Sequence, residues 1–161
     1  SITIYLKKVH NLVVGERTAE EIKIKIGSAF LDNDFDQNSI DVRGLHLLSG
    51  LPRSIALKSG EIREAMADPL NKIVEAIKRT LERTPPELAA DIVDRGIMLA
   101  GGGALVRGIN DLISHETGIF THVAENPLLC VVNGCGEVLD DFKKLKRVVD
   151  TPDFIGKAVR D

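Results

Sequence analysis

The sequence has 161 residues, of which 43% are hydrophobic and 28% are charged, and this balance predicts a folded domain, alone or with a small added lobe, rather than a disordered chain. The 24 acidic residues outnumber the 21 basic ones, and a net charge of −3 argues against nucleic acid as the main partner. Two cysteines are too few for a disulfide framework, and because no apolar run approaches the ~20 residues of a membrane-spanning helix, we expect a soluble intracellular protein.

The first segment, residues 2–12, has the periodicity of an amphipathic helix. Its apolar residues recur at helical spacing: Ile2, Tyr5, Leu6, Val9 and Leu12. No initiator Met precedes this pattern. A chain that opens within a helix is expected to be a piece of a longer protein.

A second helix is predicted from Thr18 to Gly27. Thr18 stands three residues before Glu21, which is the spacing of a capping box, and Gly27 is a common type of helix end. The alternation at residues 23–26 (KIKI) also fits a strand. The cap favours the helix.

Residues 31–39 (LDNDFDQNS) form a polar loop rich in acidic side chains. The loop has half the pattern of a calcium-binding loop, but it lacks the Gly at the sixth position and the Glu at the twelfth that such a loop uses. We therefore expect a solvated loop. Two short alternating strands follow at residues 40–43 and 53–57, separated by a turn-prone stretch with two glycines and a proline.

The longest helical pattern starts at Ser59, which suits an N-cap, and continues to about residue 84. Pro69 lies inside this pattern and removes a backbone donor. We therefore expect a kink or a division into two helices, with Asp68 as N-cap and Pro69 in the first turn of the second.

After Pro86, a short helix over residues 87–93 is predicted to end at Gly96. The rest of the chain predicts an α/β architecture, with a strand buried on both faces, a glycine turn leading directly into a helix, a second strand and a last helix. The corresponding segments are residues 97–100, 101–103, 105–118, 119–124 and 128–142. Gly134 and Gly136 in the last helix predict close approach to a neighbouring backbone.

The strongest local signal for a binding site is the run at residues 99–108 (LAGGGALVRG). Glycines without Cβ atoms let backbone N–H groups approach a ligand, and a following helix adds positive potential at its N-terminus. The spacing departs from the dinucleotide fingerprint because the third Gly falls at Gly108, and no Gly-Lys-Ser/Thr of a phosphate-binding loop follows. The run predicts either a nucleotide or other small-ligand contact or a tight packing turn.

A second signal lies on the helix predicted from Thr18. Glu20 and Lys23 are one turn apart on one face, so they can pair with each other or offer an acceptor and a donor to a ligand; a solvated helix face is the alternative. The four histidines have no His or Cys neighbour at ligand spacing, which argues against a metal site. The basic run at residues 143–147 (KKLKR) predicts a solvated helix face.

Five short motifs together carry a resemblance to a known family. They are residues 15–23 (GERTAEEIK), 42–44 (VRG), 49–53 (SGLPR), 84–92 (TPPELAADI) and 101–105 (GGGAL). In this order, over roughly residues 2–140, the chain resembles the MreB family of bacterial actin homologues. The resemblance implies an α/β fold of the actin/Hsp70/sugar-kinase type, which is ribonuclease H-like, with ATP in a cleft between two domains.

By this resemblance, the chain is similar to the second of the family's two domains. Residues 1–23 and 97–145 would form an inner α/β lobe, residues 24–96 a smaller inserted α+β lobe, and residues 146–161 a tail. The resemblance also implies eight residues for the adenosine side of an ATP site: Glu20, Glu21, Ile22, Lys23, Gly102, Gly103, Ala104 and Leu105.

The implied function is that of an ATP-binding cytoskeletal protein that polymerises in the cytoplasm beneath the inner membrane and directs cell-wall synthesis and rod shape. Further copies of itself, RodZ, MreC and MreD are the implied partners, with membrane contact through the missing first domain. The intact protein would bind ATP with Mg²⁺, but both phosphate-binding turns of the family are missing here, so this chain alone is expected not to hydrolyse ATP. The alternative is a nucleotide-free interaction module from a truncated or split actin-fold protein.

Overall fold

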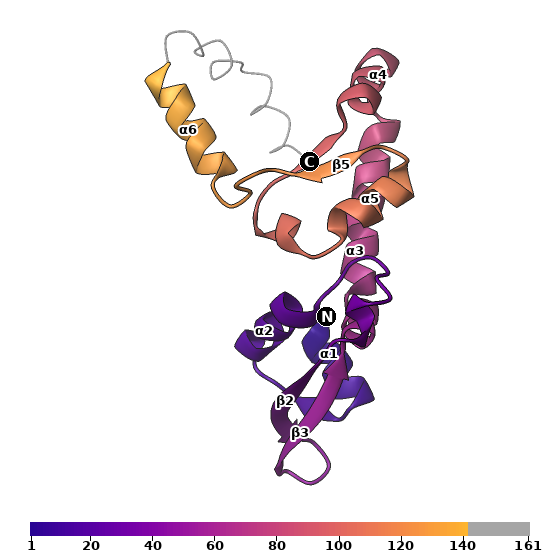
Figure 1. The fold of residues 1–161 in the computed structure, drawn as a ribbon, viewed down its shortest axis with the longest axis vertical. Coiled ribbons are helices and arrows are strands. Elements are labelled where there is room, and N and C mark those ends of the chain that lie inside the picture. Colours follow the sequence, from indigo (N-terminus) through magenta and orange to yellow (C-terminus); the bar gives the residue numbers. More distant parts are fainter. Residues whose placement is uncertain (142–161) are drawn as a thin grey trace, which may run out of the picture.

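The structure, a computed structural model, describes residues 1–141. The basic run predicted at residues 143–147 and the predicted tail at residues 146–161 lie outside the described residues. The molecule is elongated, and helix α3 (Ser59–Glu82) runs along its long axis from an N-terminal part to a C-terminal part (Figure 1). The division of the chain into an inner lobe and an inserted lobe stays a prediction.

The N-terminal part combines two helices with a three-stranded antiparallel sheet of strand order β1-β2-β3. Its elements are α1 (Ile2–Val9), β1 (Leu12–Val13), α2 (Glu16–Ile26), a 3₁₀ turn (Phe35–Gln37), β2 (Ser39–His46) and β3 (Pro52–Lys58). Strands β2 and β3 form a hairpin in which Val42 pairs with Ile55. The two predicted strands are confirmed, and both are longer than the sequence pattern indicates.

Helix α2 begins two residues before the predicted cap at Thr18. Gly15 takes the N-cap position without a side-chain hydrogen bond, so the predicted capping box is wrong. The end of the helix at Gly27 is confirmed, and so is the preference for a helix over a strand. Ile22 and Ile26 are buried while Ile24 is exposed, because residues four apart share a helix face and residues two apart do not.

Helix α3 is one helix of 24 residues that contains Pro69, so the predicted division at this residue is wrong. Buried Met66 and Leu70 flank the proline, and the helix packs on the core on both sides of it. The N-cap is Lys58 rather than Ser59, and the backbone N–H of Lys58 donates to Glu61 Oε2 at 2.9 Å. Capping therefore starts the helix one residue earlier than predicted.

The C-terminal part is a parallel β-α-β unit with a helix before it and a helix after it. Its elements are α4 (Pro86–Arg95), β4 (Ile97–Leu99), a 3₁₀ helix (Gly102–Leu105), α5 (Ile109–Thr117), β5 (Thr121–Val123) and α6 (Cys130–Asp140). The predicted helix ends at Gly96 and Gly118 are confirmed, and both glycines have positive φ, which glycine adopts without steric cost.

Three predictions for the C-terminal part are wrong. Strand β4 is not buried on both faces, because the described part of its sheet has two strands and Met98 is 64% exposed. The glycine run enters a 3₁₀ helix first, and α5 starts only at Ile109. Gly134 and Gly136 approach no neighbouring backbone, since a Cβ atom at either position would meet nothing within 4 Å in the described part of the chain.

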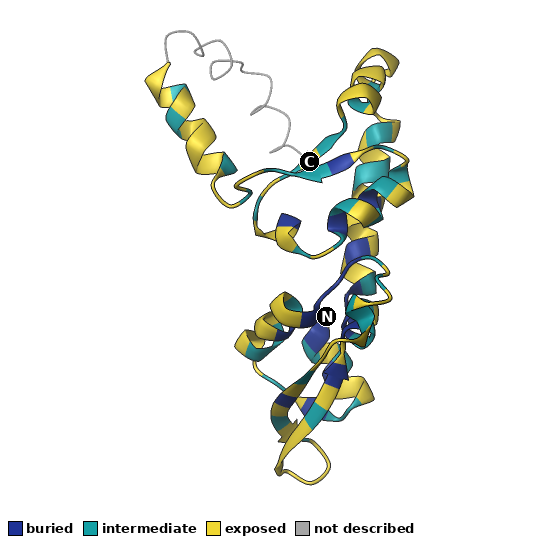
Figure 2. Cartoon of the chain, viewed as in Figure 1, coloured by how far each residue is buried: buried dark blue, intermediate teal, exposed yellow. Residues whose placement is uncertain are grey.

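One continuous hydrophobic core joins the two parts of the molecule (Figure 2). Helix α3 contributes residues along much of its length, and α1, α2, the β2–β3 hairpin and α5 pack against it. The buried residues are Ile2, Leu6, Leu12, Ile22, Ile26, Ala29, Val42, Leu57, Ile62, Ala65, Met66, Leu70, Ile109 and Ile113. Helix α5 thus ties the C-terminal part to the core, whereas α6 has no buried residue.

Among residues 1–141, no helix combines the length and the hydropathy that crossing a bilayer requires. The same residues contain no group of three or more His, Cys, Asp or Glu side chains placed to hold a metal ion. The acidic loop instead places its carboxylates in contacts with the protein: Asp36 pairs with Arg63, and Asp32 pairs with Arg107.

Truncation of the core on α1 tests this packing. Leu6→Ala should lower the free energy of unfolding by about 2–5 kcal/mol, because Leu6 is fully buried and its loss leaves a cavity. Ile4→Ala on the same helix is the matched control, since Ile4 is 57% exposed and should change stability by less than about 1 kcal/mol. Urea unfolding followed by circular dichroism measures both, and equal losses would contradict the assignment of the core.

Candidate functional site

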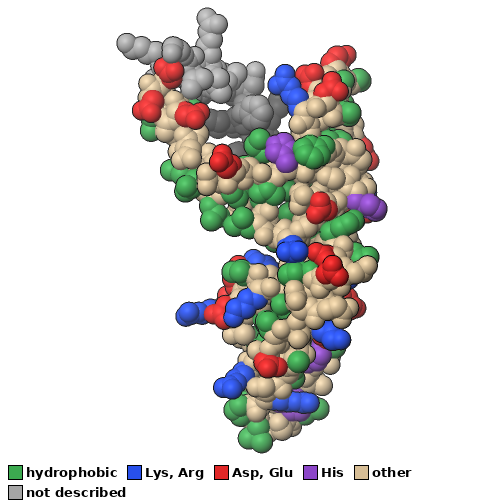
Figure 3. Space-filling model, in the orientation of Figure 1, with side chains coloured by type: hydrophobic (Ala, Val, Ile, Leu, Met, Phe, Trp, Pro, Cys, Tyr) green, Lys and Arg blue, Asp and Glu red, His purple; other side chains and the backbone are tan. Residues whose placement is uncertain are grey.

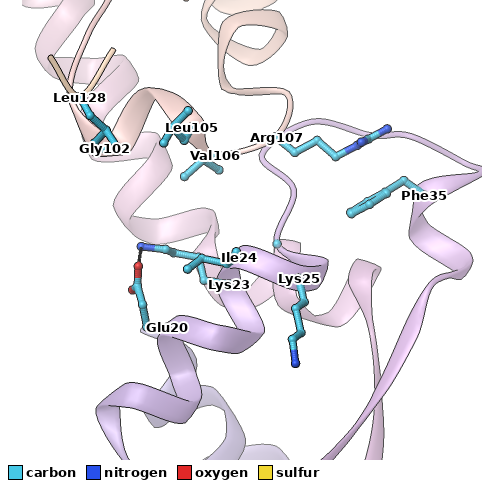
Figure 4. Close-up of a pocket in the computed structure, with 11 residues that line it drawn as sticks. Glu20, Lys23, Ile24, Lys25, Phe35, Gly102, Leu105, Val106, Arg107 and Leu128 are labelled. Carbon is cyan, nitrogen blue, oxygen red and sulfur yellow. Dashed lines mark ion pairs between the residues drawn. The ribbon is translucent and has the colours of Figure 1, made fainter. Parts of the chain in front are cut away.

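A cavity of about 470 Å³ separates helix α2 from the glycine run (Figure 4). This volume lies within the range of small-molecule sites in proteins. Three segments that are far apart in the sequence form its walls: the exposed side of α2, the glycine run with the residues after it, and the loop that contains Phe35.

Helix α2 forms the first wall. Because Ile22 and Ile26 are held in the core, the helix turns Glu20, Lys23 and Ile24 toward the cavity. Lys23 Nζ lies 2.8 Å from Glu20 Oε1, which makes an ion pair between residues three apart. Such partly exposed pairs contribute little stability, so the ammonium and the carboxylate can turn to a ligand at small cost.

The glycine run forms the second wall. Gly101 has a φ of 82°, and its N–H donates to the carbonyl oxygen of Pro127 at 2.7 Å, which fixes the entry to the 3₁₀ helix. The first N–H groups of a helix have no partner within the helix, so the backbone can donate to a ligand here. A Cβ atom at Gly102 would lie 3.5 Å from Leu128 Cδ2, in ordinary van der Waals contact, and both residues line the cavity.

The third wall pairs an aromatic ring with a cation. The Arg107 guanidinium lies 4.1 Å from the centre of the Phe35 ring, and Arg107 Nη2 donates to Asp32 Oδ2 at 3.1 Å. The backbone N–H of Phe35 also donates to Asp32 Oδ1 at 3.1 Å. The Phe35 amide, and after it the Arg107 side chain, hold the pKa of Asp32 below its usual value, because both stabilise the ionised carboxylate.

A backbone contact sets the distance between the walls. Ser28 and Arg107 form a parallel bridge, and the N–H of Ala29 donates to the carbonyl oxygen of Arg107 at 2.8 Å. Gly108, with a φ of 70°, lies so near Phe30 that a Cβ atom would be 3.0 Å from Phe30 Cβ. The backbone bridge and hydrogen bond therefore hold the segment after α2 and the segment after the glycine run side by side at the edge of the cavity.

Four of the eight predicted site residues line the cavity: Glu20, Lys23, Gly102 and Leu105. The pairing of the α2 motif with the glycine run, which are about eighty positions apart in the sequence, is thus present in the fold. Their role toward a ligand stays a prediction.

The other four predicted residues do not line the cavity. Glu21 lies on a neighbouring side of α2 with its Oε1 3.5 Å from Arg17 Nε, and Ile22 is buried in the core. Ala104 is the buried residue of the 3₁₀ helix, and Gly103 is exposed but does not line the cavity.

The predicted site residues leave out seven residues that also line the cavity: Ile24, Lys25, Gly27, Phe35, Val106, Arg107 and Leu128. For Val106 and Arg107 a signal was present, since both lie within the run at residues 99–108. No local pattern identifies Phe35, because contacts between residues far apart in the sequence hold its loop at the cavity, among them the Asp32–Arg107 and Asp36–Arg63 ion pairs.

The cavity has the chemistry of a binding site for a mostly apolar molecule with a few polar groups. Ile24, Leu105 and Val106 offer apolar contacts, whereas Glu20 and Lys23 offer an acceptor and a donor. The apolar side chains and the charged pair together therefore support recognition of a ligand at this cavity.

Comparison with known proteins identifies relatives of the chain. The profile of a family described as "MreB/Mbl protein" matches residues 1–147. The chain is 47% identical over 143 residues to the cell shape-determining protein Mbl of Bacillus subtilis (strain 168), covering 89% of this chain and 42% of that protein. It is 46% identical over 140 residues to the cell shape-determining protein MreB of Escherichia coli (strain K12), covering 87% of this chain and 40% of that protein.

A solved structure shows the same fold. The crystal structure of MreB5 of Spiroplasma citri bound to ADP superposes with a TM-score of 0.84 at 34% identity, over 91% of this chain and 44% of that one. The expected α/β fold of the actin type is thereby confirmed. The chain spans less than half the length of the relatives that it matches.

The shifted pKa of Asp32 predicts a pH dependence of stability at the third wall. A carboxyl group with a lowered folded-state pKa stabilises the fold above its unfolded pKa of about 3.9 and loses that contribution as the pH falls through the folded value. Asp32→Asn should therefore lower the unfolding midpoint at pH 7, and this effect should shrink as the pH falls below about 4.

Urea titrations of both proteins between pH 3 and pH 7 measure this difference. Asp34→Asn, in the same loop, is the control, because the structure describes no ion pair for Asp34. The role of the carboxylate would be contradicted if the unfolding midpoints of Asp32→Asn and the parent chain differed by the same amount at pH 3 and at pH 7.

Proposed function

The chain belongs to the MreB/Mbl family, and from this premise we propose that it is the nucleoside-binding part of an ATP-binding, actin-like protein that determines cell shape. One observation carries the proposal: the cavity lies between the Glu20–Lys23 pair of α2 and Gly102 of the glycine run. The ADP-bound state of Spiroplasma citri MreB5, a relative with the same fold, supports a nucleotide as the ligand.

The residues present fit the nucleoside end of such a ligand. Gly102 would let the ligand lie against the backbone, since it lines the cavity and has no side chain. Ile24, Leu105 and Val106 would exclude water from the faces of a base. Lys23 and Glu20 would bond to polar groups at its edge or to ribose hydroxyls, which need both a donor and an acceptor.

The chemistry of the phosphates lies elsewhere. ATP supplies a phosphoanhydride bond, and its cleavage needs Mg²⁺ and clamps that stabilise the charge on the transferred group. In the cavity, Lys23, Lys25 and Arg107 are the cations, and Lys23 and Arg107 are each paired with a carboxylate. We propose that this chain binds and orients the nucleoside, and that the remainder of a full-length family member supplies the phosphate contacts.

At the level of the whole protein, we propose the behaviour that the family resemblance implies. The intact protein would bind ATP with Mg²⁺, assemble with further copies into filaments beneath the inner membrane, and direct cell-wall synthesis together with RodZ, MreC and MreD. The curated relatives are named cell shape-determining proteins Mbl and MreB, and these names support the proposed role in cell shape. Membrane contact would come from the domain that the longer relatives have before this one.

Titration with a fluorescent ATP analogue tests nucleoside binding. The chain should bind the analogue with saturation, and Gly102→Leu should weaken binding at least ~10-fold, which corresponds to about 1.4 kcal/mol, because the leucine fills the cavity. Gly134→Leu on α6 is the matched control, since a Cβ atom there would meet nothing within 4 Å in the described part of the chain and Gly134 does not line the cavity. Absence of saturable binding to the parent chain would favour the nucleotide-free interaction module instead.

A phosphate-release assay tests the expectation that this chain alone does not hydrolyse ATP. With excess ATP and Mg²⁺, the chain should release phosphate at the rate of the buffer control, because the described residues of the cavity provide no phosphate clamp. A full-length relative, such as MreB of Escherichia coli, is the reference for the assay. ATP hydrolysis by this chain at the rate of the reference protein would refute the proposal that the remainder of a full-length family member supplies the phosphate contacts.

A further inference from the structure

Strand β2 has a stretch of edge that no other strand of its sheet covers. On one side, β3 pairs with it from Ser39 to Leu45. On the other side, β1 is only two residues long and pairs with Leu45 and His46. The chain then leaves the sheet, because α2 begins at Glu16. In the described sheet, residues 39–43 of β2 therefore have a strand on one side and none on the other, and we call this stretch the open edge.

The hydrogen bonds of the hairpin determine which backbone groups face the open edge. The N–H of His46 donates to the carbonyl oxygen of Leu51 at 2.9 Å, which makes these two residues a bonded pair. Bonded and non-bonded pairs alternate along an antiparallel ladder, so the even-numbered residues of β2 bond to β3 and the odd-numbered ones face away from it. The backbone N–H and C=O groups of Asp41 and Arg43 therefore point out of the open edge, and no hydrogen bond among residues 1–141 engages them there.

Helix α2 lies beside the open edge and makes it one side of a groove of about 300 Å³ (Figure 1). Thr18, Glu21 and Lys25 line the groove from the helix, and residues 40–43 line it from the strand. Val42 is buried in the core with its side chain on the side of the sheet that α2 covers, so the bottom of the groove is apolar. An extended chain laid along the open edge would thus have a wall beside it as well as a strand.

The side chains of the open edge carry opposite charges. Successive residues of a strand alternate between its faces, so Asp41 and Arg43 both stand on the exposed face, opposite to buried Val42. Neither forms an ion pair with another described residue, and the same is true of Lys25 on the helix. Figure 3 shows acidic and basic side chains interspersed with hydrophobic ones on the N-terminal part, without a field of one sign. A partner that carries both charges fits such a surface better than a polyanion does.

We propose that the open edge of β2 binds an extended peptide segment of a partner protein, which adds to the sheet antiparallel to β2 and in line with β1. Outward-facing N–H and C=O groups at every second residue are matched by another extended backbone, because such a backbone presents the same groups at the same spacing. Asp41 and Arg43 would each exchange a pair of hydrogen bonds with the segment. This binding site is separate from the function proposed for the nucleoside cavity.

Charge and strand direction define the side chains of the segment. In an antiparallel arrangement its residues lie, in chain order, opposite Arg43, Val42 and Asp41. An acidic residue opposite Arg43 and a basic residue opposite Asp41 would form stabilising cross-strand pairs, whereas the reverse order would set like charges opposite each other. The residue between them would point to the side of the sheet that α2 covers, where an aliphatic side chain can enter the groove over Val42. The partner segment is therefore acidic–aliphatic–basic in sequence.

A second copy of β2 fits the open edge less well than such a segment. Antiparallel pairing of two β2 strands with Asp41 opposite Arg43 would place Ser39 of one copy opposite Leu45 of the other, where Val13 is already paired. A shift of the register that avoids this overlap sets Asp41 of one copy opposite Asp41 of the other, and like charges directly opposite each other destabilise a sheet. Pairing between two copies is nevertheless one of the outcomes that the experiment distinguishes.

Titration of the isotope-labelled chain with the peptide acetyl-Thr-Glu-Val-Lys-Thr-amide, followed by amide NMR spectra, tests the proposal. The peptide should bind with a Kd of about 1 mM or tighter, the range of specific association. The amides of Asp41 and Arg43 should exchange with solvent at least ~10-fold more slowly when the peptide is bound, because they gain hydrogen bonds. The amide of Val42 already bonds to β3, so its exchange should change less.

Modified peptides separate backbone pairing from contact through side chains. The N–H groups of the peptide's Glu and Lys would bond to the open edge, so methylation of both nitrogens should abolish binding. Methylation of the Val nitrogen, whose N–H would point away from the edge, should leave binding unchanged. A peptide with Glu and Lys exchanged should bind at least ~3-fold more weakly, since both cross-strand pairs then become like-charged.

Two proline variants provide a matched pair on the protein. Arg43 and Ser54 lie opposite each other in one non-bonded pair, so each has its N–H on an outer edge of the hairpin. Arg43→Pro removes the donor from the open edge and should abolish binding, whereas Ser54→Pro removes a donor from the other edge and should bind like the parent chain. The double variant Asp41→Lys with Arg43→Glu should prefer the exchanged peptide, and this reversal of preference does not depend on the stability of the proline variants.

Each other result overturns the proposal. Unchanged amides of Asp41 and Arg43 up to about 1 mM peptide would exclude binding at the open edge. Slower exchange at Ser54 and Ala56 instead would assign the peptide to the outer edge of β3. Protection of Asp41 and Arg43 that rises with protein concentration in the absence of peptide, together with a dimer in sedimentation velocity, would assign the open edge to a second copy. Equal binding of the doubly methylated peptide would exclude pairing through the backbone.

Discussion

The candidate site depends on one backbone contact, where the chain after α2 meets the chain after the glycine run. The bridge between Ser28 and Arg107, with the N–H of Ala29 donating to the carbonyl oxygen of Arg107 at 2.8 Å, fixes the two walls of the cavity relative to each other. Gly108 makes this approach possible, because a Cβ atom at its position would lie 3.0 Å from Phe30 Cβ. The glycine run at residues 101–103 forms one wall of the cavity, and Gly108 allows that wall to pack close to the segment after α2.

Local patterns were sufficient for most elements of the fold. Apolar spacing identified α1, α2, α3 and α5, and Pro86, Gly96 and Gly118 marked helix boundaries, because their backbone preferences are properties of the residue itself. The caps at Thr18 and Ser59 were placed wrongly, since either hydroxyl can cap a helix and the packing of the helix decides which turn comes first. Pro69 was expected to kink or divide α3, and it does not divide the helix, because burial of Met66 and Leu70 on both sides outweighs one missing hydrogen bond.

For the site, the sequence indicated the segments but not which of their residues face the cavity. The α2 motif and the glycine run do lie across from each other, yet Glu21, Ile22 and Ala104 point elsewhere, because a helix or a 3₁₀ turn distributes successive side chains around its axis. No local sequence pattern predicts that Phe35 lines the cavity. Its loop is brought to Arg107 by a contact between residues about eighty positions apart, and such contacts exist only in the folded chain.

Two groups of exposed apolar residues differ in the charges that surround them. Leu128, Val131 and Val132 lie along a stretch, residues 127–136, that contains no charged residue, which is the composition of a permanent, core-like interface. The four exposed leucines of the β2–β3 turn, Leu45, Leu47, Leu48 and Leu51, instead stand between Arg43 and Arg53, and charged rims are typical of surfaces that must also be stable in water. The uncharged surface around α6 therefore has the composition of a core-like interface, whereas the leucines of the hairpin turn have the charged surroundings of a solvated surface.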